Sequence, residues 1–394
     1  MEEAPGLDGL VETLLPRVEV LSGLEARRPV QLARRDSESV RRYVEARLAE
    51  DLPPEELEGV QAAYVAFGLL PDTLELRRFL LELYTEQVVG YYDAATDSLF
   101  VVEGVPADEL RPVVVHELVH ALQDQYVDLD SLIAPDQGND RHTAAQAALE
   151  GHATLVMFAW LAESQTGRPV DPASFPDVAR DLAPLLEAQN SQFPVFQAAP
   201  RIIRETLLFP YVGGAAFVQA LWRAGAGAGG GAFPAPLGEL LPESTEQVLH
   251  PESRFLADRD APTELAFAPI ASDWRRVYEN TLGELEVSIL LSEHLGRGME
   301  TFASGWDGDR YVVLESPGGD HVLVWYSVWD NPAAADRFAY AYRRVLDARP
   351  GRHGAVTRTE VGGKPAVRVV DAPEAVPLAS VPAVEVAEAT EGAR

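Results

Sequence analysis

The sequence contains no cysteine and only one lysine, Lys364, among its 394 residues. Without cysteine there can be no disulfide framework, no thiolate metal site and no cysteine nucleophile. Any bound metal must therefore be held by nitrogen and oxygen ligands. The formal net charge of -30 and the pI near 4.6 exclude a nucleic-acid partner, because binding phosphates requires clustered cationic side chains.

Long apolar runs are also missing. No stretch approaches the roughly 18 to 20 apolar residues of a transmembrane helix. The opening MEEAPGLDGL is acidic, whereas a signal peptide begins basic and continues apolar. We expect no transmembrane segment and a cytoplasmic location as the sequence stands, or export if a signal segment has been removed. With 47% apolar and 24% charged residues, the composition is typical of a folded protein with two or three packed units.

Helical periodicity dominates the start of the chain, and residues 1–86 are predicted to be an N-terminal helical region. Ser37 is a plausible N-cap for a helix over 38–50, a second helix opens at Pro53 and Pro54, and a third begins at Asp72 or Thr73.

The pattern changes at QVVGYYDAATDSLFVV, residues 87–102, where two short β-rich runs flank a turn and predict a hairpin. Long helices are predicted over about 107–127 and 140–164. Helical structure with proline-rich breaks continues to 272, interrupted by the glycine-rich AGAGAGGGAF at 224–233, which predicts a flexible linker. Residues 87–272 thus form a central unit.

A small α+β unit is predicted over 273–370. It begins with a helix, NTLGELEVSILLSEHL, and continues with strands near 309–315 and 321–329, a helix near 332–347 and a hairpin that turns at Gly362 and Gly363. The last residues, 371–394, are rich in Pro, Ala and Glu, and we predict a disordered tail.

The motif HELVH at residues 116–120 is the strongest indication of a chemical function in the sequence. Four residues separate His116 from His120, so both imidazoles lie on one face of a helix and can reach the same ion. In HExxH sites the two histidines bind zinc, and the glutamate, here Glu117, takes a proton from a metal-bound water. Val115, Leu118, Val119, Leu122 and Tyr126 form an apolar stripe that predicts a core-anchored helix independently of the motif.

A catalytic zinc requires a third protein ligand and an open position. The candidates are Asp124, His142, Glu150 and His152. We favour Glu150, because Ala147, Ala148 and Gly151 around it leave room for a second helix, and an apolar stretch seldom contains a glutamate without a partner. His142 and His152 remain alternatives. Metzincins place a third histidine six residues after the second, and residue 126 is a tyrosine, which excludes that class.

HELVH followed by a helix with the short ALEG run resembles the gluzincin, thermolysin-like branch of zincin metallopeptidases. Together with FPYVGGAAFVQAL and STEQVLHPE, it is also similar to a set of poorly characterised bacterial gluzincin-like proteins. The resemblance covers roughly residues 75–255. It implies an α+β fold with a mainly helical zincin-like core, in which the hairpin supplies an edge strand for an extended peptide. It departs from thermolysin-like enzymes at Thr154, where a carboxylate commonly lies four residues after the third ligand.

Three further residues are candidates for supporting roles. Asp124, four residues beyond His120, can accept the second N–H of that imidazole, although a solvent-exposed acid near a helix end is an equal alternative. An oxyanion donor outside the metal helices is expected from the resemblance, and Tyr211 and His250 are the candidates. Their plain alternatives are a packed aromatic for Tyr211 and a capping or surface histidine for His250.

The sequence thus predicts a zinc metallopeptidase that uses one Zn2+ on His116, His120 and Glu150, with Glu117 as the general base and a peptide or protein as substrate. The alternative is a catalytically inactive, zinc-stabilised zincin-like protein that binds peptides or partners. A surface-interaction role centred on the C-terminal α+β unit ranks lowest, because that unit shows no chemical motif. The sequence specifies neither the oligomeric state nor the cleavage preference.

Overall fold

A computed structural model describes residues 7–132, 138–227, 233–270 and 273–389. The structure is α+β, as the sequence predicts, with 55% helix and 18% strand, so helices form most of the molecule. Its helices are α1 Leu7–Ser22, α2 Ser37–Asp51, α3 Pro54–Phe67, α4 Leu76–Gln87, α5 Ala107–Gln123, α6 Leu129–Leu132, α7 Asn139–Thr166, α8 Val178–Asn190, α9 Pro194–Ala198, α10 Arg201–Gly227, α11 Thr245–Leu249, α12 Gly283–Leu295 and α13 Pro332–Asp347. Its strands are β1 Gln31–Arg35, β2 Gly90–Asp93, β3 Ser98–Val102, β4 Leu265–Phe267, β5 Arg275–Asn280, β6 Trp306–Glu315, β7 His321–Trp329, β8 Arg352–Val361, β9 Lys364–Pro373 and β10 Val386–Glu388.

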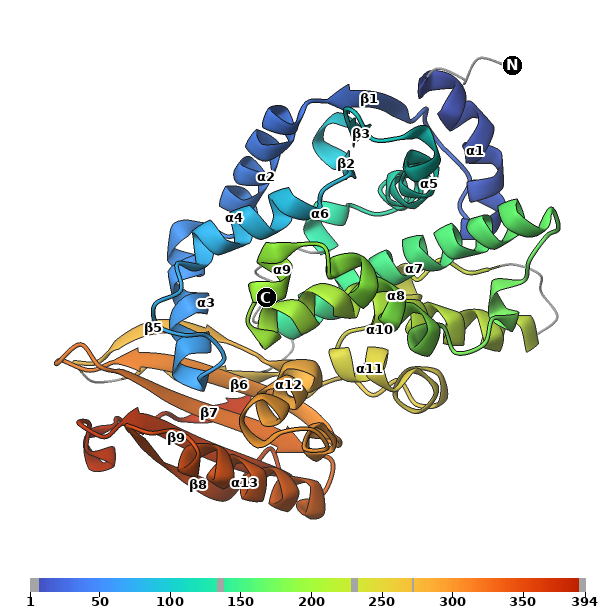
Figure 1. Cartoon of the computed structure of the whole chain (residues 1–394). Helices are drawn as coiled ribbons and strands as arrows, with labels where there is room; N and C mark the ends of the chain where they lie inside the picture. The colour runs from blue at the N-terminus through green and yellow to red at the C-terminus, as the bar shows by residue number, and fades with distance from the viewer. Residues whose placement is uncertain (1–6, 133–137, 228–232, 271–272, 390–394) are drawn as a thin grey trace.

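The predicted hairpin at 87–102 is present as β2 and β3, and it belongs to a three-stranded sheet of order β1-β3-β2. Strand β1 pairs parallel to β3, with Gln31 opposite Ser98. Residues 1–86 are therefore not a purely helical region, since they contribute a strand to the sheet and pack α1 against α5 and α7 (Figure 1). The sequence QLARR gave no strand signal because it is short, charged and mostly exposed.

The predicted long helices are α5 and α7. The stripe on α5 is anchored as expected, because Val115, Leu118, Val119 and Leu122 are completely buried. The helix nevertheless ends at Gln123 rather than near 127, which leaves Asp124 and Tyr126 outside it. The tyrosine turns to the N-terminal segment, where its hydroxyl donates to the Glu25 carbonyl.

Helices α7 and α10 lie against each other through the middle of the molecule (Figure 1). At their crossing Gly151 meets Gly214, and a Cβ on Gly214 would lie 1.9 Å from the Ala147 carbonyl oxygen. The small residues predicted to admit a second helix thus admit α10. This helix continues to Gly227, so the first part of the predicted linker 224–233 is helical, while 228–232 lies outside the described residues.

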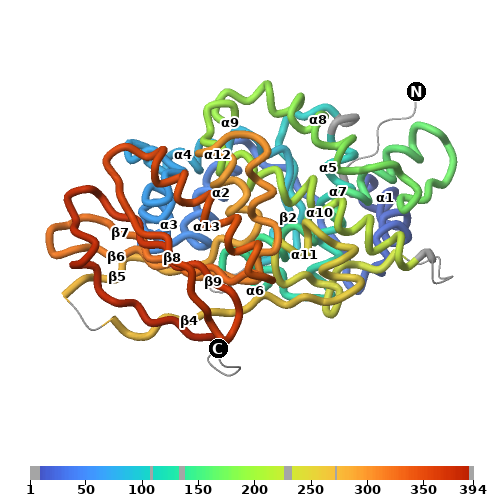
Figure 2. Tube along the Cα trace, turned by 90° about the horizontal axis from the view of Figure 1, so that it is seen from below, coloured from blue at the N-terminus to red at the C-terminus, as the bar shows by residue number. Residues whose placement is uncertain are grey.

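The C-terminal unit contains a five-stranded antiparallel sheet of order β5-β6-β7-β9-β8. The strands, helix and hairpin predicted there are confirmed, and β5 is an addition that the sequence did not indicate. Helices α3, α12 and α13 contact this sheet, and side chains such as Phe67 and Trp325 join its helix-covered face to the core of the first two thirds of the chain. Figure 2 shows the sheet at one end of the molecule and α1 at the other.

The second face of the sheet is covered by the segment predicted to be a disordered tail. Residues 371–389 complete β9, bury Val376 and Val384 against the sheet, and pair β10 with β4. The Tyr326 hydroxyl donates to the Val384 carbonyl. The Pro- and Glu-rich composition of this segment suggested disorder. The sheet is apolar on both faces, however, and the valines spaced along the segment pack on the face that the helices leave uncovered.

Among the helices of the described residues, none combines the length and the hydrophobicity that a membrane crossing requires.

The glycine crossing is expected to tolerate no side chain. Gly214→Ala forces a methyl group into the backbone of α7 and should lower the free energy of unfolding by about 1–3 kcal/mol or more. Gly225→Ala on the same helix is the control, because its Cβ would meet only Pro234 at 3.7 Å and alanine favours helix by about 1 kcal/mol. Urea unfolding of both variants measures the difference. Equal stabilities would contradict the close contact.

Candidate metal centre

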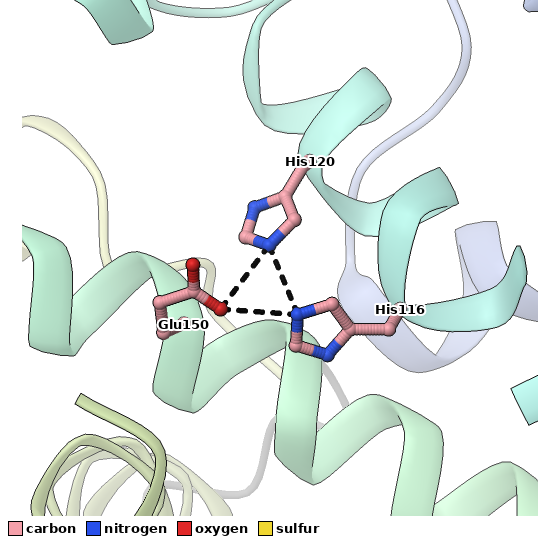
Figure 3. A group of neighbouring side chains, drawn as sticks. All are labelled: His116, His120 and Glu150. Atoms are coloured by element: carbon pink, nitrogen blue, oxygen red, sulfur yellow. Dashed lines mark hydrogen bonds and ion pairs between the residues drawn. The ribbon is translucent and has the colours of Figure 1, made fainter. Parts of the chain in front are cut away.

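Helices α5 and α7 bring His116, His120 and Glu150 together (Figure 3). The Nε2 atom of His116 lies 3.0 Å from Glu150 Oε2 and 3.1 Å from His120 Nε2. The third side of the triangle, from His120 Nε2 to Glu150 Oε2, is 3.4 Å. The two histidines come from successive turns of α5, and the glutamate comes from the middle of α7, so the three side chains predicted as ligands converge on one point.

The triangle fits the chemistry of zinc. A tetrahedral zinc ion holds nitrogen and oxygen ligands at about 2.0–2.1 Å, which sets neighbouring ligands about 3.3 Å apart. The three sides observed lie close to that spacing. The side chains of His116, His120 and Glu150 are 13%, 14% and 19% exposed, so the centre is only partly buried.

One other group of acidic side chains has ligand atoms close together within the described part of the chain: Glu246, Asp260 and Asp330. Arg254 forms ion pairs with all three. Because a guanidinium already supplies the positive charge, this group does not resemble a metal site.

The electrostatics of the triangle favour a cation. Burial raises the pKa of Glu150, but the neighbouring imidazoles outweigh burial and hold that pKa well below its usual range. For His120 burial alone would lower the pKa. The negative charge of Glu150 outweighs this effect and raises the pKa of His120 to about 9. The His120 imidazole therefore holds its proton where a divalent ion would bind, and binding of the ion would displace that proton.

Glu117 is held beside the triangle by the hairpin. Its Oε2 accepts a hydrogen bond of 2.9 Å from the backbone N–H of Tyr92 in β2. That strand is the last of its sheet in the order β1-β3-β2. The carboxylate is therefore oriented by the edge strand, next to the predicted metal ligands.

Tyr211 reaches the site from α10. Its ring stacks on His116 with centroids 6.2 Å apart and an interplanar angle of 29°. The negative charge of Glu150, followed by burial and by Glu117, raises the pKa of the Tyr211 phenol well above its usual value. The phenol therefore keeps its proton, and its ring lies against one of the predicted ligands, His116.

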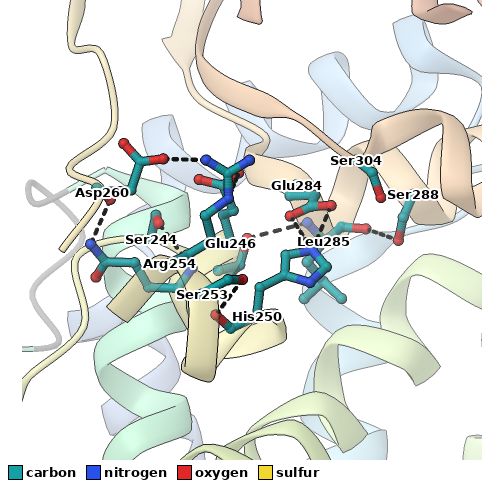
Figure 4. A network of polar contacts seen from close by, with 12 residues as sticks. Ser244, Glu246, His250, Ser253, Arg254, Asp260, Glu284, Leu285, Ser288 and Ser304 are labelled. Atoms are coloured by element: carbon teal, nitrogen blue, oxygen red, sulfur yellow. Dashed lines mark hydrogen bonds and ion pairs between the residues drawn. The ribbon is translucent and has the colours of Figure 1, made fainter. Parts of the chain in front are cut away.

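His250 is not part of this centre. It ends α11, and its Nε2 lies 3.0 Å from Glu284 Oε1 on α12, beside the network around Arg254 (Figure 4). The hydrogen bond to Glu284 raises the pKa of His250. Among the described residues, His250 is thus paired with Glu284 and not clustered with His116, His120 and Glu150. The histidine lies at the contact between α11 of the helical core and α12 of the C-terminal unit.

Asp124 is not the partner of His120 either. It accepts hydrogen bonds from Arg28 Nη2 at 2.8 Å and from the Tyr92 hydroxyl at 2.9 Å, because the end of α5 turns its side chain away from the histidine face. His120 Nδ1 instead lies 2.9 Å from Gln123 Oε1. Sequence reasoning missed this glutamine, whose position three residues after His120 was the available signal.

The alternative third ligands do not join the triangle. His152 is completely buried, burial lowers its pKa to about 3, and its ring nitrogens contact Ser22 and Gln123. His142 lies two turns before Glu150 on α7 and is not among the clustered ligand atoms of the described residues. Thr154 is buried without a hydrogen-bond partner for its hydroxyl among the described residues.

In a comparison with known protein families, a match was found for the C-terminal unit only. Residues 272–391 match a family described as a domain of unknown function (DUF8575). This match begins near the predicted boundary at 273 and includes β10, so it follows the ordered unit rather than the predicted end at 370. No curated protein and no solved structure matches the chain. The candidate metal centre lies outside the matched residues.

Proposed function

We propose that the chain is a zinc-dependent metallopeptidase of the gluzincin type, with His116, His120 and Glu150 as the zinc ligands. The observation that carries the proposal is the triangle of their ligand atoms, whose sides of 3.0, 3.1 and 3.4 Å suit a tetrahedral ion. A zinc ion there would act as a Lewis acid toward the scissile carbonyl and would make a water acidic enough to react near neutral pH.

Glu117 would act as the general base. Because its Oε2 accepts the Tyr92 N–H, the carboxylate is oriented and its other oxygen can receive the proton of the attacking water. The same group would then deliver that proton to the leaving amine. A purely structural zinc site has no use for a base in this position, so Glu117 favours an enzyme over a non-catalytic zinc protein.

Tyr211 would stabilise the negative charge that develops on the carbonyl oxygen of the substrate. The protonated phenol and the contact of its ring with His116 support this role. Within the described residues β2 is an edge strand whose Tyr92 N–H is engaged by Glu117, and an edge strand in this position supports an extended peptide as the substrate.

Glu117→Gln is the direct test of the proposed reaction. The amide keeps the shape and the acceptor oxygen for Tyr92 but cannot take a proton, so we expect kcat for peptide hydrolysis to fall by about 10²–10⁴-fold. Zinc content, measured by mass spectrometry of the metal, should stay at one ion per chain. Undiminished hydrolysis would refute the role of Glu117, and wild-type protein that binds zinc without cleaving peptides would indicate the binding-protein alternative.

Tyr211→Phe tests the oxyanion donor. Loss of the hydroxyl should lower kcat by about 10²-fold or more and leave KM and zinc content nearly unchanged. Tyr84→Phe is the matched control, since Tyr84 is a neighbouring tyrosine of α4 and its phenol is influenced by Asp51 rather than by the site carboxylates. Steady-state kinetics on one peptide compares the two. Equal kcat values for both variants would assign Tyr211 to packing alone.

A further inference from the structure

A chain of buried hydrogen bonds leads from the back of the metal centre to the N-terminal helix. His120 Nδ1 lies 2.9 Å from Gln123 Oε1, and Gln123 Nε2 lies 3.1 Å from His152 Nδ1. His152 Nε2 in turn lies 3.1 Å from the carbonyl oxygen of Ser22, the last residue of α1. Gln123, His152 and Ser22 are each completely buried.

The direction of each bond in this chain follows from its fixed ends. The Ser22 carbonyl can only accept, so His152 Nε2 carries the hydrogen. Gln123 Nε2 also donates to the Leu149 carbonyl at 3.1 Å, which identifies that atom as the amide nitrogen and not the oxygen. The second hydrogen of the same NH₂ group then points to His152 Nδ1, which accepts it.

The amide oxygen of Gln123 is thereby left facing His120. Because that oxygen can only accept, His120 must carry a hydrogen on Nδ1, and its remaining nitrogen, Nε2, is the one that faces His116 and Glu150. A flipped amide would place two oxygens, those of Gln123 and Leu149, against each other in a buried site, which is strongly unfavourable.

We propose that Gln123 is the positioning residue of the metal centre: oriented by His152 and by the Leu149 carbonyl, it holds His120 in the Nδ1–H tautomer with Nε2 free for the metal. The proposal rests on the zinc site of the proposed function. It assigns to a glutamine and a buried histidine the role that a carboxylate commonly has behind a zinc-bound imidazole. It also makes the backbone of α1 an outer support of the site.

Gln125, two residues after Gln123 and just beyond the end of α5, provides a matched control. It is 8% exposed, and its side chain binds the backbone of Arg27 and Arg28, so it ties the N-terminal segment to the end of α5 without touching His120. A substitution at Gln125 therefore loosens the same region but leaves the imidazole partner in place. A purely structural role for Gln123 would make the two glutamines equivalent.

The experiment compares zinc affinity in the full-length wild type, Gln123→Met and Gln125→Met by competition with a chromophoric chelator. Methionine keeps the length of glutamine and removes the polar atoms. We expect zinc binding to weaken about 10- to 100-fold in Gln123→Met and to change less than about twofold in Gln125→Met, although both metal-free variants melt at lower temperature. Equal affinity of Gln123→Met and wild type overturns the positioning role and leaves the metallopeptidase proposal standing. Wild-type protein that takes up no zinc overturns both.

A second measurement needs no variant and holds even if Gln123→Met does not fold. In zinc-loaded wild type, long-range ¹H–¹⁵N spectra of the histidines should show His152 with its hydrogen on Nε2 and His120 with its hydrogen on Nδ1. The two rings are thus expected in opposite tautomers. A hydrogen on Nδ1 of His152, or on Nε2 of His120, overturns the proposal.

Discussion

A partly buried carboxylate between two imidazoles is the interaction on which the arrangement of the helices depends. Glu150 lies in the middle of α7 among buried alanines and Gly151, where an unpaired charge would be strongly unfavourable. His116 and His120 meet it at 3.0 and 3.4 Å, which fixes how α5 crosses α7. The small residues around Glu150 then let α10 approach at Gly214, and the same helix carries Tyr211 onto His116.

The surroundings of this interaction are set by parts of the chain that are distant in sequence. The edge strand β2 orients Glu117 through the Tyr92 N–H, and the backbone of α1 supports Gln123 through His152. The C-terminal unit meets the core where α3 contacts the sheet and α11 contacts α12, and at the second of these contacts His250 meets Glu284. The family match is confined to this last unit, and one apolar core joins the helices that carry the candidate metal centre to the sheet.

Sequence patterns predicted the parts of the structure that local physics determines. Periodic apolar residues predicted the buried face of α5, the hairpin at 87–102 and the strands after 305. The HExxH spacing predicted that both histidines lie on one face of α5. Glu150 was favoured as the third ligand because it is a charged residue within an apolar helical stretch. Strand β1 and the ordered residues 371–389 were missed, because their structure comes from partners far along the chain. Gln123 was missed and Asp124 was proposed in its place, because the exact end of α5 decides which side chain faces His120, and that end follows from tertiary contacts.

The central claim is that three side chains from two helices hold one zinc ion. Anomalous diffraction from crystals of the zinc-loaded protein, recorded on both sides of the zinc absorption edge, tests it most directly. The account predicts one peak per chain, about 2.0–2.1 Å from His116 Nε2, His120 Nε2 and a Glu150 carboxylate oxygen. A peak among Glu246, Asp260 and Asp330 instead, or a zinc ion bound by His152 in place of Glu150, would contradict it.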